Sequence, residues 1–328
     1  MKILVVTNMY PTKEHPYFGV FVKEQVENYR KLYPNDNVDL LHVSTPKSGG
    51  SYLSYFSLLI KLIWHRAAGG YDVVHCHHAF CTIAAKLCGF RNIVYTNHEG
   101  EYFKKGAVEK FKLLAISWAD RIIFVNKLMK EQVNHLHRAP SYFIPCGLDY
   151  SKFLVTTPAE TRRALVGLKN DDFIVFFPAN PSRKEKGFER LNAALVKLKT
   201  EFSNITCVTG GTIPYEEMVN WYAASDLVVS CSDYESDGMI YKESILTGRY
   251  FLTPDVGNAR YYSNNGKFGQ IYSLSSSDDL YEKLRALILE PHHLAIADDI
   301  PLVVTNFEIE TVSRKIKSVY KDALKLIS

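Results

Sequence analysis

The stretch LVVSCSDYESDGMIYKESILTG, residues 227–248, carries the signal on which the fold assignment depends. Its first residues form a short apolar run of the kind found in strands that are buried on both faces. A polar loop follows, and Gly238 lets the backbone turn sharply into the helix that the remaining residues favour. A strand that leads directly into a helix is the repeating unit of an α/β fold.

The same alternation recurs along the whole chain. It predicts parallel sheets in a doubly wound arrangement, and two sets of strands predict two Rossmann-like domains. The predicted strands are KILVVT (2–7), VDLLHVS (38–44), DVVHCH (72–77), NIVYTNH (92–98), RIIFVN (121–126) and YFIP (142–145), then FIVFFPA (173–179), ITCVTG (205–210), LVVSCS (227–232) and YFLTP (250–254).

The domain boundaries follow from turn residues and helical spacing. Residues 147–172 are rich in polar and turn residues, so we expect an N-terminal domain over 1–150 and a C-terminal domain over 151–306. Residues 307–328 show helical spacing after Asn306, a suitable cap, and are expected to form a helix that crosses back to the N-terminal domain. Two facing domains of this kind favour a ligand site in the cleft at the carboxyl ends of their strands.

Composition excludes several classes of protein. With 47% hydrophobic and 23% charged residues, the 328-residue chain is unlike a disordered one. Its net charge of +4 without a basic stripe argues against a nucleic-acid binder. The charge is divided unevenly, because Lys and Arg exceed Asp and Glu by 18 to 12 over residues 1–150, whereas residues 151–328 hold 21 cations and 23 anions. The cationic first half therefore needs an explanation.

The cysteines and the N-terminus bear on the cellular location. The six cysteines include no C-x-x-C pair, so we expect reduced thiols. MKILVVTNMY (1–10) has no small-residue cleavage site and is expected to be a strand rather than a signal peptide. No apolar stretch reaches the roughly 18 residues of a membrane span. We therefore expect a cytoplasmic protein that at most lies peripherally on the inner face of the cell membrane.

The loop and helix of the opening stretch predict an anion site. The first amides of the helix, near Gly238, Met239 and Ile240, have no partner within it and attract phosphate. Glu235 precedes them, and Glu243 follows about 7 Å along the helix axis. Two carboxylates, which can accept hydrogen bonds from sugar hydroxyls, thus lie on either side of the predicted site. The same spacing also fits an ordinary helix-start charge at Glu235 and a surface residue at Glu243.

The pattern E-x7-E with E-S-x-x-T-G resembles the signature of the retaining nucleotide-sugar glycosyltransferases of family 4, which have the GT-B fold. Further blocks that resemble the family occur in the same order over nearly the whole chain. They are TNMYP (7–11), GVFVKEQ (19–25), DVVHCHH (72–78), VYTNHEG (94–100), ADRIIFVN (119–126), IPCGLD (144–149), NPSRKEKG (180–187), YAASDL (222–227) and TPDVGN (253–258).

The resemblance implies roles for the residues of the second domain. Glu243 would bind the ribose of the nucleotide, and Glu235 would hold hydroxyls of the donor sugar. The amides of residues 238–240 would bind the sugar or the diphosphate. Lys186 would neutralise the diphosphate as it leaves, because charge builds there in the transition state. Without the resemblance, Lys186 reads as an exposed loop lysine.

Two residues of the first domain match family positions. His98 corresponds to the family's active-site histidine, which would donate to a donor-sugar hydroxyl or orient the acceptor. Gly19 would let the N-terminal loop approach the phosphate closely, or would merely serve a turn.

The chain also departs from the family pattern. Asn180-Pro181 stands where the family usually has Gly-Arg, and Arg183 is the nearest replacement or else a solvated loop charge. The stretch between Lys186 and Glu235 is about one strand–helix unit shorter than in typical members. The resemblance therefore implies a shortened C-terminal domain that lacks part of the usual nucleobase pocket.

The histidines of DVVHCHH raise the question of a metal. His75 and His77 share one face of a strand, but no carboxylate or cysteine pair accompanies them at metal spacing. The family resembled needs no metal, so we expect neither a metal nor a cofactor. His78 is expected to line the acceptor side.

Two aromatic, basic segments lie in the cationic half. For residues 52–66 we favour a packed helix with a solvated face. For residues 102–112, with Lys104 and Lys105, the same packed arrangement and a face toward a membrane or a polyanionic acceptor stay equally open. The cationic half is therefore expected to face the acceptor or a membrane.

Together these features predict a retaining glycosyltransferase that moves a sugar from a nucleotide-diphosphate donor to a saccharide or lipid-linked acceptor in cell-surface glycan assembly. Two alternatives stay open: an epimerase or phosphorylase of the same fold, and a non-catalytic partner that binds sugar nucleotides. A dinucleotide oxidoreductase is disfavoured because no G-x-G-x-x-G follows any predicted strand.

Overall fold

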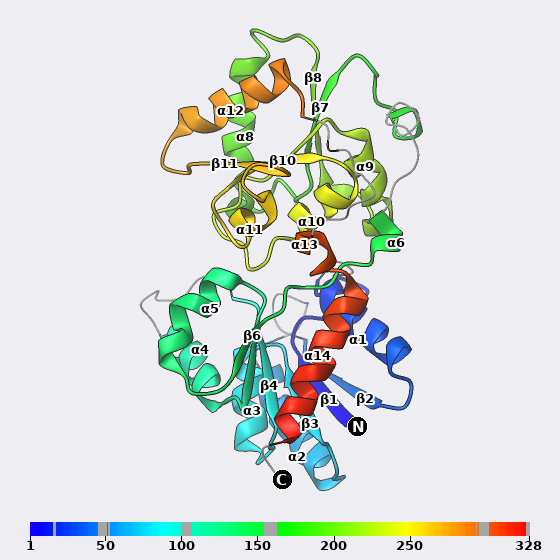
Figure 1. Ribbon diagram of the computed structural model, residues 1–328, viewed down its shortest axis with the longest axis vertical. Helices are drawn as coiled ribbons and strands as arrows, with labels where there is room; N and C mark the ends of the chain where they lie inside the picture. Colours follow the sequence, from blue (N-terminus) through cyan, green and yellow to red (C-terminus); the bar gives the residue numbers. More distant parts are fainter. Residues whose placement is uncertain are drawn as a thin grey trace. The chain divides into compact units, whose positions relative to one another are not determined.

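The computed structural model describes residues 1–15, 18–44, 51, 53–99, 107–153, 163–292, 294 and 302–325. The chain forms two compact units, each with its own parallel sheet (Figure 1). The first unit comprises Met1–Leu148 together with Asn306–Ser328, and the second comprises Asp149–Thr305.

The sheet of the first unit has six strands in the order β2-β1-β3-β4-β5-β6, all parallel. All six strands predicted from the sequence of this half are confirmed. They are β1 (Lys2–Thr7), β2 (Asn37–His42), β3 (Val73–Cys76), β4 (Ile93–Asn97), β5 (Arg121–Phe124) and β6 (Ser141–Phe143).

Helices cover both faces of this sheet because alternate residues of its strands point to opposite sides. Ile3 and Val5 pack with α1 (Val20–Leu32) and α14 (Ile309–Leu324). Leu4 and Val6 pack on the other side, in a cluster with the helices that follow β2 and β3. The helices described on that side are α2 (Ser54–Ala67), α3 (Ala79–Leu87), α4 (Ala107–Trp118), α5 (Lys127–Val133) and the 3-10 turn η2 (Asn134–Leu136).

Helix α14 is the predicted closing helix, and it belongs to the core of the first unit. Val312 and Ile316 are buried against the sheet. The expected cap at Asn306 is wrong, because the Glu308 carboxylate accepts the Thr311 amide at 2.7 Å and caps the helix instead. The Glu308 carboxylate thus pairs with an amide at the helix start that has no partner within the helix, as a capping asparagine would.

The sheet of the second unit has five parallel strands in the order β11-β10-β9-β7-β8. Four of them were predicted: β7 (Phe173–Phe177), β8 (Ile205–Thr209), β9 (Leu227–Val229) and β10 (Tyr250–Pro254). Sequence reasoning missed β11 (Gly269–Tyr272), a four-residue edge strand that begins with a glycine and carries no continuous apolar run.

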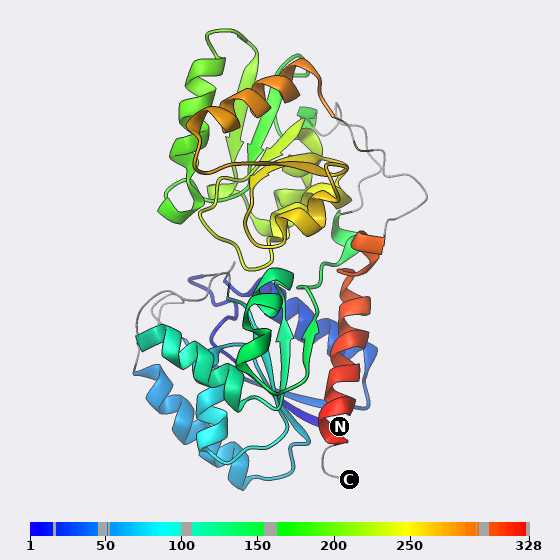
Figure 2. The same cartoon turned by 60° about the vertical axis from the view of Figure 1, so that its left-hand side comes forward.

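Helices again lie on both faces (Figure 2). Leu191 of α8 and Leu284 of α12 join the core with Val175 and Phe177 of β7. On the other face, Phe176 packs against Tyr222 of α9 with ring centroids 5.0 Å apart. The helices described are α6 (Tyr150–Phe153), α8 (Phe188–Leu198), α9 (Met218–Ala224), α10 (Met239–Leu246), α11 (Ala259–Ser263), α12 (Ser277–Leu289) and α13 (Leu302–Thr305), with 3-10 turns η3 (Lys184–Lys186), η4 (Gly210–Thr212) and η5 (Tyr215–Glu217).

Candidate functional site

The loops that follow β7 and β9 bring Lys186 and Glu235 together. Lys186 Nζ donates to Glu235 Oε1 at 2.5 Å, although the two residues are 49 positions apart. Their side chains are only 17% and 16% exposed. Ser232 Oγ donates to the same carboxylate oxygen at 2.8 Å. Lys186 is therefore not the exposed loop lysine that its local sequence allows; it is paired at the carboxyl edge of the sheet.

Gly187 fixes how closely these two loops approach. It has φ 66, and a Cβ there would lie 2.3 Å from the Cys231 carbonyl oxygen. Arg190 donates to that same oxygen at 2.8 Å, and Asp233 donates its amide to the Glu185 carbonyl at 2.9 Å. The close packing requires glycine at position 187, because any side chain would push the loops of Lys186 and Glu235 apart.

The predicted anion site lies at the start of α10. Gly238 has φ 88 and precedes the helix, whose first residues are Met239 and Ile240. The first amides of an α-helix have no carbonyl partner within it, and here these include the amides of Met239 and Ile240. The glycine and the helix start thus stand where the sequence predicted them, and Glu235 lies on the loop before them.

A buried ion pair supports this helix start. Lys242 donates to Asp237, and both side chains are almost completely buried. Asn258 and Tyr262 donate to the other Asp237 oxygen at 2.6 and 2.9 Å. Sequence reasoning missed this pair, although Asp237 and Lys242 are oppositely charged and only five positions apart. Buried charges persist only when paired, so the pair ties α10 to α11.

Glu243 is also buried, at 7% exposure, which excludes its interpretation as a surface residue. Tyr222 donates its hydroxyl to Glu243 Oε2 at 2.5 Å. Burial, together with the Glu243 carboxylate, raises the pKa of Tyr222 well above its usual value, so the phenol stays a donor. The carboxylate is therefore held in place from within the domain.

Arg183 occupies a different environment. Its guanidinium binds Glu185 Oε1 at 2.8 and 2.6 Å, and its side chain is 57% exposed. This geometry is that of a solvated ion pair within one loop. Arg183 thus lies on the loop of Lys186 but is engaged by its own neighbour.

His98 follows β4 in the first unit and belongs to a group of stacked imidazoles. Its Nε2 lies 3.0 Å from His77 Nδ1, and the two rings stack with centroids 5.3 Å apart. His75 lies behind them. Its Nδ1 is 2.6 Å from the Tyr320 hydroxyl, and its Nε2 is 2.6 Å from the Thr96 hydroxyl. Burial lowers the pKa of all three, and that of His77 falls to about 3. All three are therefore neutral near pH 7.

This grouping differs from a metal site. Within the described ranges, no cluster of three or more His, Cys, Asp or Glu side chains could hold a metal ion. His77 contacts His98, a pairing that the alternation of residues along a strand does not reveal.

The remaining predicted residues of the first unit lie near the same edge or outside the described residues. Gly19, with φ 76, precedes α1, and a Cβ there would meet the Met9 carbonyl carbon at 2.3 Å. His78 caps α3 by accepting the Phe80 amide at 3.2 Å. Lys104 and Lys105 lie outside the described residues.

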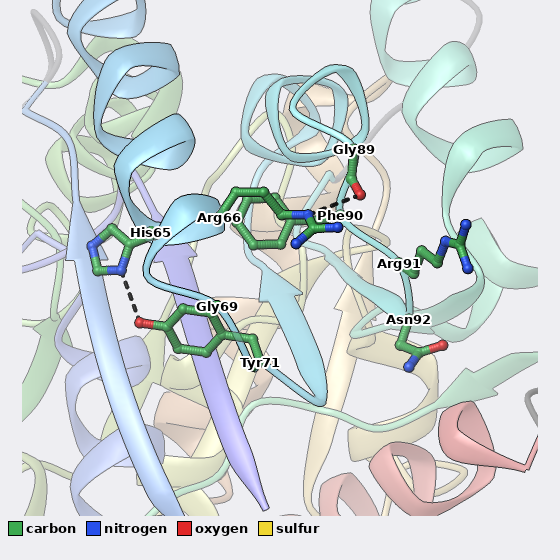
Figure 3. A pocket seen from close by; sticks show the side chains of 9 residues that line it. His65, Arg66, Gly69, Tyr71, Gly89, Phe90, Arg91 and Asn92 are labelled. Carbon is green, nitrogen blue, oxygen red and sulfur yellow. Dashed lines mark hydrogen bonds between the residues drawn. The ribbon is translucent and has the colours of Figure 1, made fainter.

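A pocket of ≈ 200 Å³ lies at the opposite edge of the first sheet (Figure 3). It is formed by the residues just before β3 and β4, where the amino ends of the strands lie. His65 Nδ1 lies 2.8 Å from the Tyr71 hydroxyl, and Arg66 Nε donates to the Gly89 carbonyl at 3.4 Å. Ligands of doubly wound sheets bind at the carboxyl ends, so this pocket is separate from the site at His98.

Comparison with known proteins gives a family match that covers most of the first unit's N-terminal segment and ends just beyond it. Residues 27–152 match the family described as Glycosyltransferase Family 4. No curated protein sequence matches the chain significantly. This part of the chain is therefore similar to glycosyltransferase family 4.

Solved structures match the whole length. A sucrose-phosphate synthase from Thermosynechococcus elongatus has 16% identity and a TM-score of 0.77, with 100% of both chains covered. HepE of Anabaena in complex with UDP-glucose has 16% identity and a TM-score of 0.72, covering 98% of this chain and 100% of its own. WaaG, a glycosyltransferase involved in lipopolysaccharide biosynthesis, has 13% identity and a TM-score of 0.64, with 100% of both covered. The chain shares the GT-B fold of such glycosyltransferases.

Proposed function

We propose that this chain, a glycosyltransferase by its similarity to family 4, moves a sugar from a nucleotide-diphosphate donor to a hydroxyl of a saccharide or lipid-linked acceptor, with retention at the anomeric carbon. The observation that carries the proposal is the Lys186–Glu235 pair, whose glutamate lies on the loop before the start of α10. The Lys186 ammonium and the first amides of α10 can bind a diphosphate, and the Glu235 carboxylate can accept hydrogen bonds from sugar hydroxyls. Together these groups suit a sugar diphosphate.

The reaction breaks the bond between the anomeric carbon and the β-phosphate oxygen and forms one to the acceptor oxygen. Lys186 stabilises the charge that grows on the leaving diphosphate, together with the amides at the start of α10. Glu235 accepts hydrogen bonds from donor-sugar hydroxyls. The acceptor attacks from the same face as the leaving group, and its proton passes to a phosphate oxygen. The proposal needs no metal ion.

Glu243 binds the ribose in this proposal. Its contact with the Tyr222 hydroxyl at 2.5 Å holds one carboxylate oxygen in a fixed orientation. A carboxylate so fixed loses little entropy when it accepts ribose hydroxyls, which favours binding.

His98 contacts the donor sugar or orients the acceptor. Because the pKa of His98 lies well below its usual value, its imidazole is neutral near pH 7 and can donate or accept a hydrogen bond. A neutral ring next to a sugar hydroxyl positions it without adding charge.

The donor class is supported by one of the solved structures. HepE of Anabaena was solved with UDP and with UDP-glucose. UDP-sugars are therefore the first donors to test for this chain. We further propose a cytoplasmic enzyme of cell-surface glycan assembly that contacts the membrane peripherally through its first domain.

A ligand screen followed by a transfer assay tests the proposal. Nucleotides, nucleotide diphosphates and nucleotide sugars are compared for their effect on the melting temperature, which rises when a ligand binds only the native state. We expect a shift with at least one nucleotide diphosphate, and product only when an acceptor is added. Conversion of the donor sugar without an acceptor would indicate an epimerase, and no shift with any nucleotide would contradict the proposal.

A further inference from the structure

Helix α2 presents an apolar face to solvent. Its buried side is formed by Leu58 and Leu62, which have no exposed area and pack under the first sheet. The sequence favoured a packed helix with a solvated face here; the helix is packed on one side as predicted, and its solvated side is apolar. Its exposed large residues are Leu53 (79%), Phe56 (69%), Ile60 (49%), Ile63 (58%) and Trp64 (73%).

These five residues form one stripe, here called the α2 stripe. At 3.6 residues per turn they fall within an arc of about 100°, opposite to Leu58 and Leu62. Figure 2 shows α2 in light blue along the outside of the first unit. Scattered exposed apolar residues are ordinary on protein surfaces, but a continuous helical stripe that includes a tryptophan marks an interaction surface.

Positive charge borders the α2 stripe on both sides. Lys61 and Arg66 are exposed and project about 60° beyond its two edges. No acidic residue occurs between positions 53 and 71. Arg91 adds a further cation at the pocket beyond the end of α2 (Figure 3). Apolar residues flanked by cations are complementary to an anionic bilayer surface, where rings enter the headgroup region and cations meet lipid phosphates.

The charge pattern distinguishes a bilayer from a second copy of the chain. If two α2 stripes packed on each other, the cations that flank them would be brought together, and no carboxylate on α2 could compensate. The helix is also too short to span a membrane, because 14 residues extend about 21 Å against the ~30 Å hydrocarbon core. In the described ranges, no helix is long and apolar enough to cross one.

The N-terminal end of α2 lies beside the predicted acceptor residue. Tyr55 stacks on His78 with ring centroids 6.1 Å apart, and its hydroxyl accepts from Asn8 Nδ2 at 2.8 Å. A bilayer in contact with the α2 stripe would therefore run past His78, at the carboxyl edge of the sheet.

We propose that the α2 stripe docks the protein on an anionic phospholipid surface, with α2 lying in the plane of the headgroups. Docking in this orientation brings a lipid-linked acceptor to the edge that carries His78. The assignment of that acceptor edge rests on the proposed transfer reaction, whereas the lipid contact does not.

Vesicle flotation in the absence of any donor or acceptor tests the lipid contact. The full chain is mixed with phosphatidylcholine vesicles, with and without about a third phosphatidylglycerol. We expect binding to the anionic vesicles only, and a loss of at least about fivefold in affinity for each of Lys61→Glu and Arg66→Glu, because each change removes a cation and adds an anion. The double variant Ile60→Glu/Trp64→Glu should abolish binding. The matched control Val196→Glu/Leu289→Glu, at two exposed apolar residues of the second unit, should bind as the original chain does.

A second measurement does not depend on the stripe variants, which could lose binding simply because they misfold. Brominated acyl chains should quench Trp64 fluorescence in a Trp118→Phe/Trp221→Phe background, which keeps the stripe intact. Equal binding to neutral and anionic vesicles, no quenching, or dimerisation that the double variant relieves would overturn the proposal. Transfer to a water-soluble acceptor should be unchanged in Ile60→Glu/Trp64→Glu, so a lost lipid contact and a wrong catalytic assignment give different results.

Discussion

Lys186 Nζ lies 2.5 Å from Glu235 Oε1, so an ion pair joins the loop after β7 to the loop after β9. Both side chains are mostly buried, which strengthens their interaction relative to a surface pair. In the proposed reaction the lysine also meets the diphosphate, so this contact sets where the leaving group binds.

Removing the Lys186 ammonium should impair the chemical step. We expect Lys186→Ala to lower kcat by about 100-fold to 1,000-fold, the usual effect of deleting a group that stabilises transition-state charge. The measurement is the initial transfer rate at saturating donor. Lys184→Ala serves as the control, because Lys184 is exposed on the same turn. A Lys186→Ala rate within threefold of the original would exclude the assigned role.

Gly187 should be more sensitive to substitution than a glycine with similar backbone angles elsewhere. Gly187→Ala adds both left-handed strain and a contact of 2.3 Å with the Cys231 carbonyl oxygen, whereas Gly167, at φ 73, has nothing within 4 Å of the added Cβ. We expect Gly167→Ala to cost about 1 kcal/mol and Gly187→Ala clearly more, with reduced transfer. Urea unfolding and the transfer rate check this; equal costs would show that the loop contact is unimportant.

The buried pair of Asp237 and Lys242 should behave non-additively. Removing one partner leaves the other charge buried, so Asp237→Asn or Lys242→Met alone should cost about 3–5 kcal/mol. The double variant should cost less than the two single changes together, since neither charge then remains. The free energy of unfolding of all four proteins completes the cycle. Additive costs would mean that the two side chains act independently.

The first unit should lose stability on mild acidification. Burial lowers the pKa of His75, His77 and His98, so the folded state binds fewer protons than the unfolded chain below about pH 6.5. Stability therefore falls as the pH drops from 7 to 5. For His77, with a pKa of about 3, the loss by pH 5 is about 2 kcal/mol.

Urea unfolding at pH 7, 6 and 5 measures this loss. His77→Asn should show a smaller decrease on acidification, while His135→Asn, at an exposed histidine, should follow the original protein. An unchanged pH dependence in His77→Asn would contradict the link between its burial and stability.

The sequence predicted ten of the eleven strands described because most of them are fully buried and show as continuous apolar runs. It could not predict β11, since an edge strand that begins at Gly269 has no such run. The helix start at Gly238 could also be predicted, because a glycine between a polar loop and a helical pattern affects only the backbone next to it.

Contacts between distant segments could not be predicted from local sequence patterns. The pairing of Lys186 with Glu235, of Tyr222 with Glu243, and of His77 with His98 each joins separate elements of the fold. Nothing in the spacing of residues along a strand or helix specifies such partners.

The sequence by itself thus determined the α/β repeats, the helix start after Gly238 and the uneven charge, because periodicity, glycine and ionisable groups act over a few residues. Only the tertiary structure decided which carboxylates are buried, which histidines share protons and which face of α2 stays exposed. Those properties depend on what packs against each side chain, and packing is set when distant segments meet.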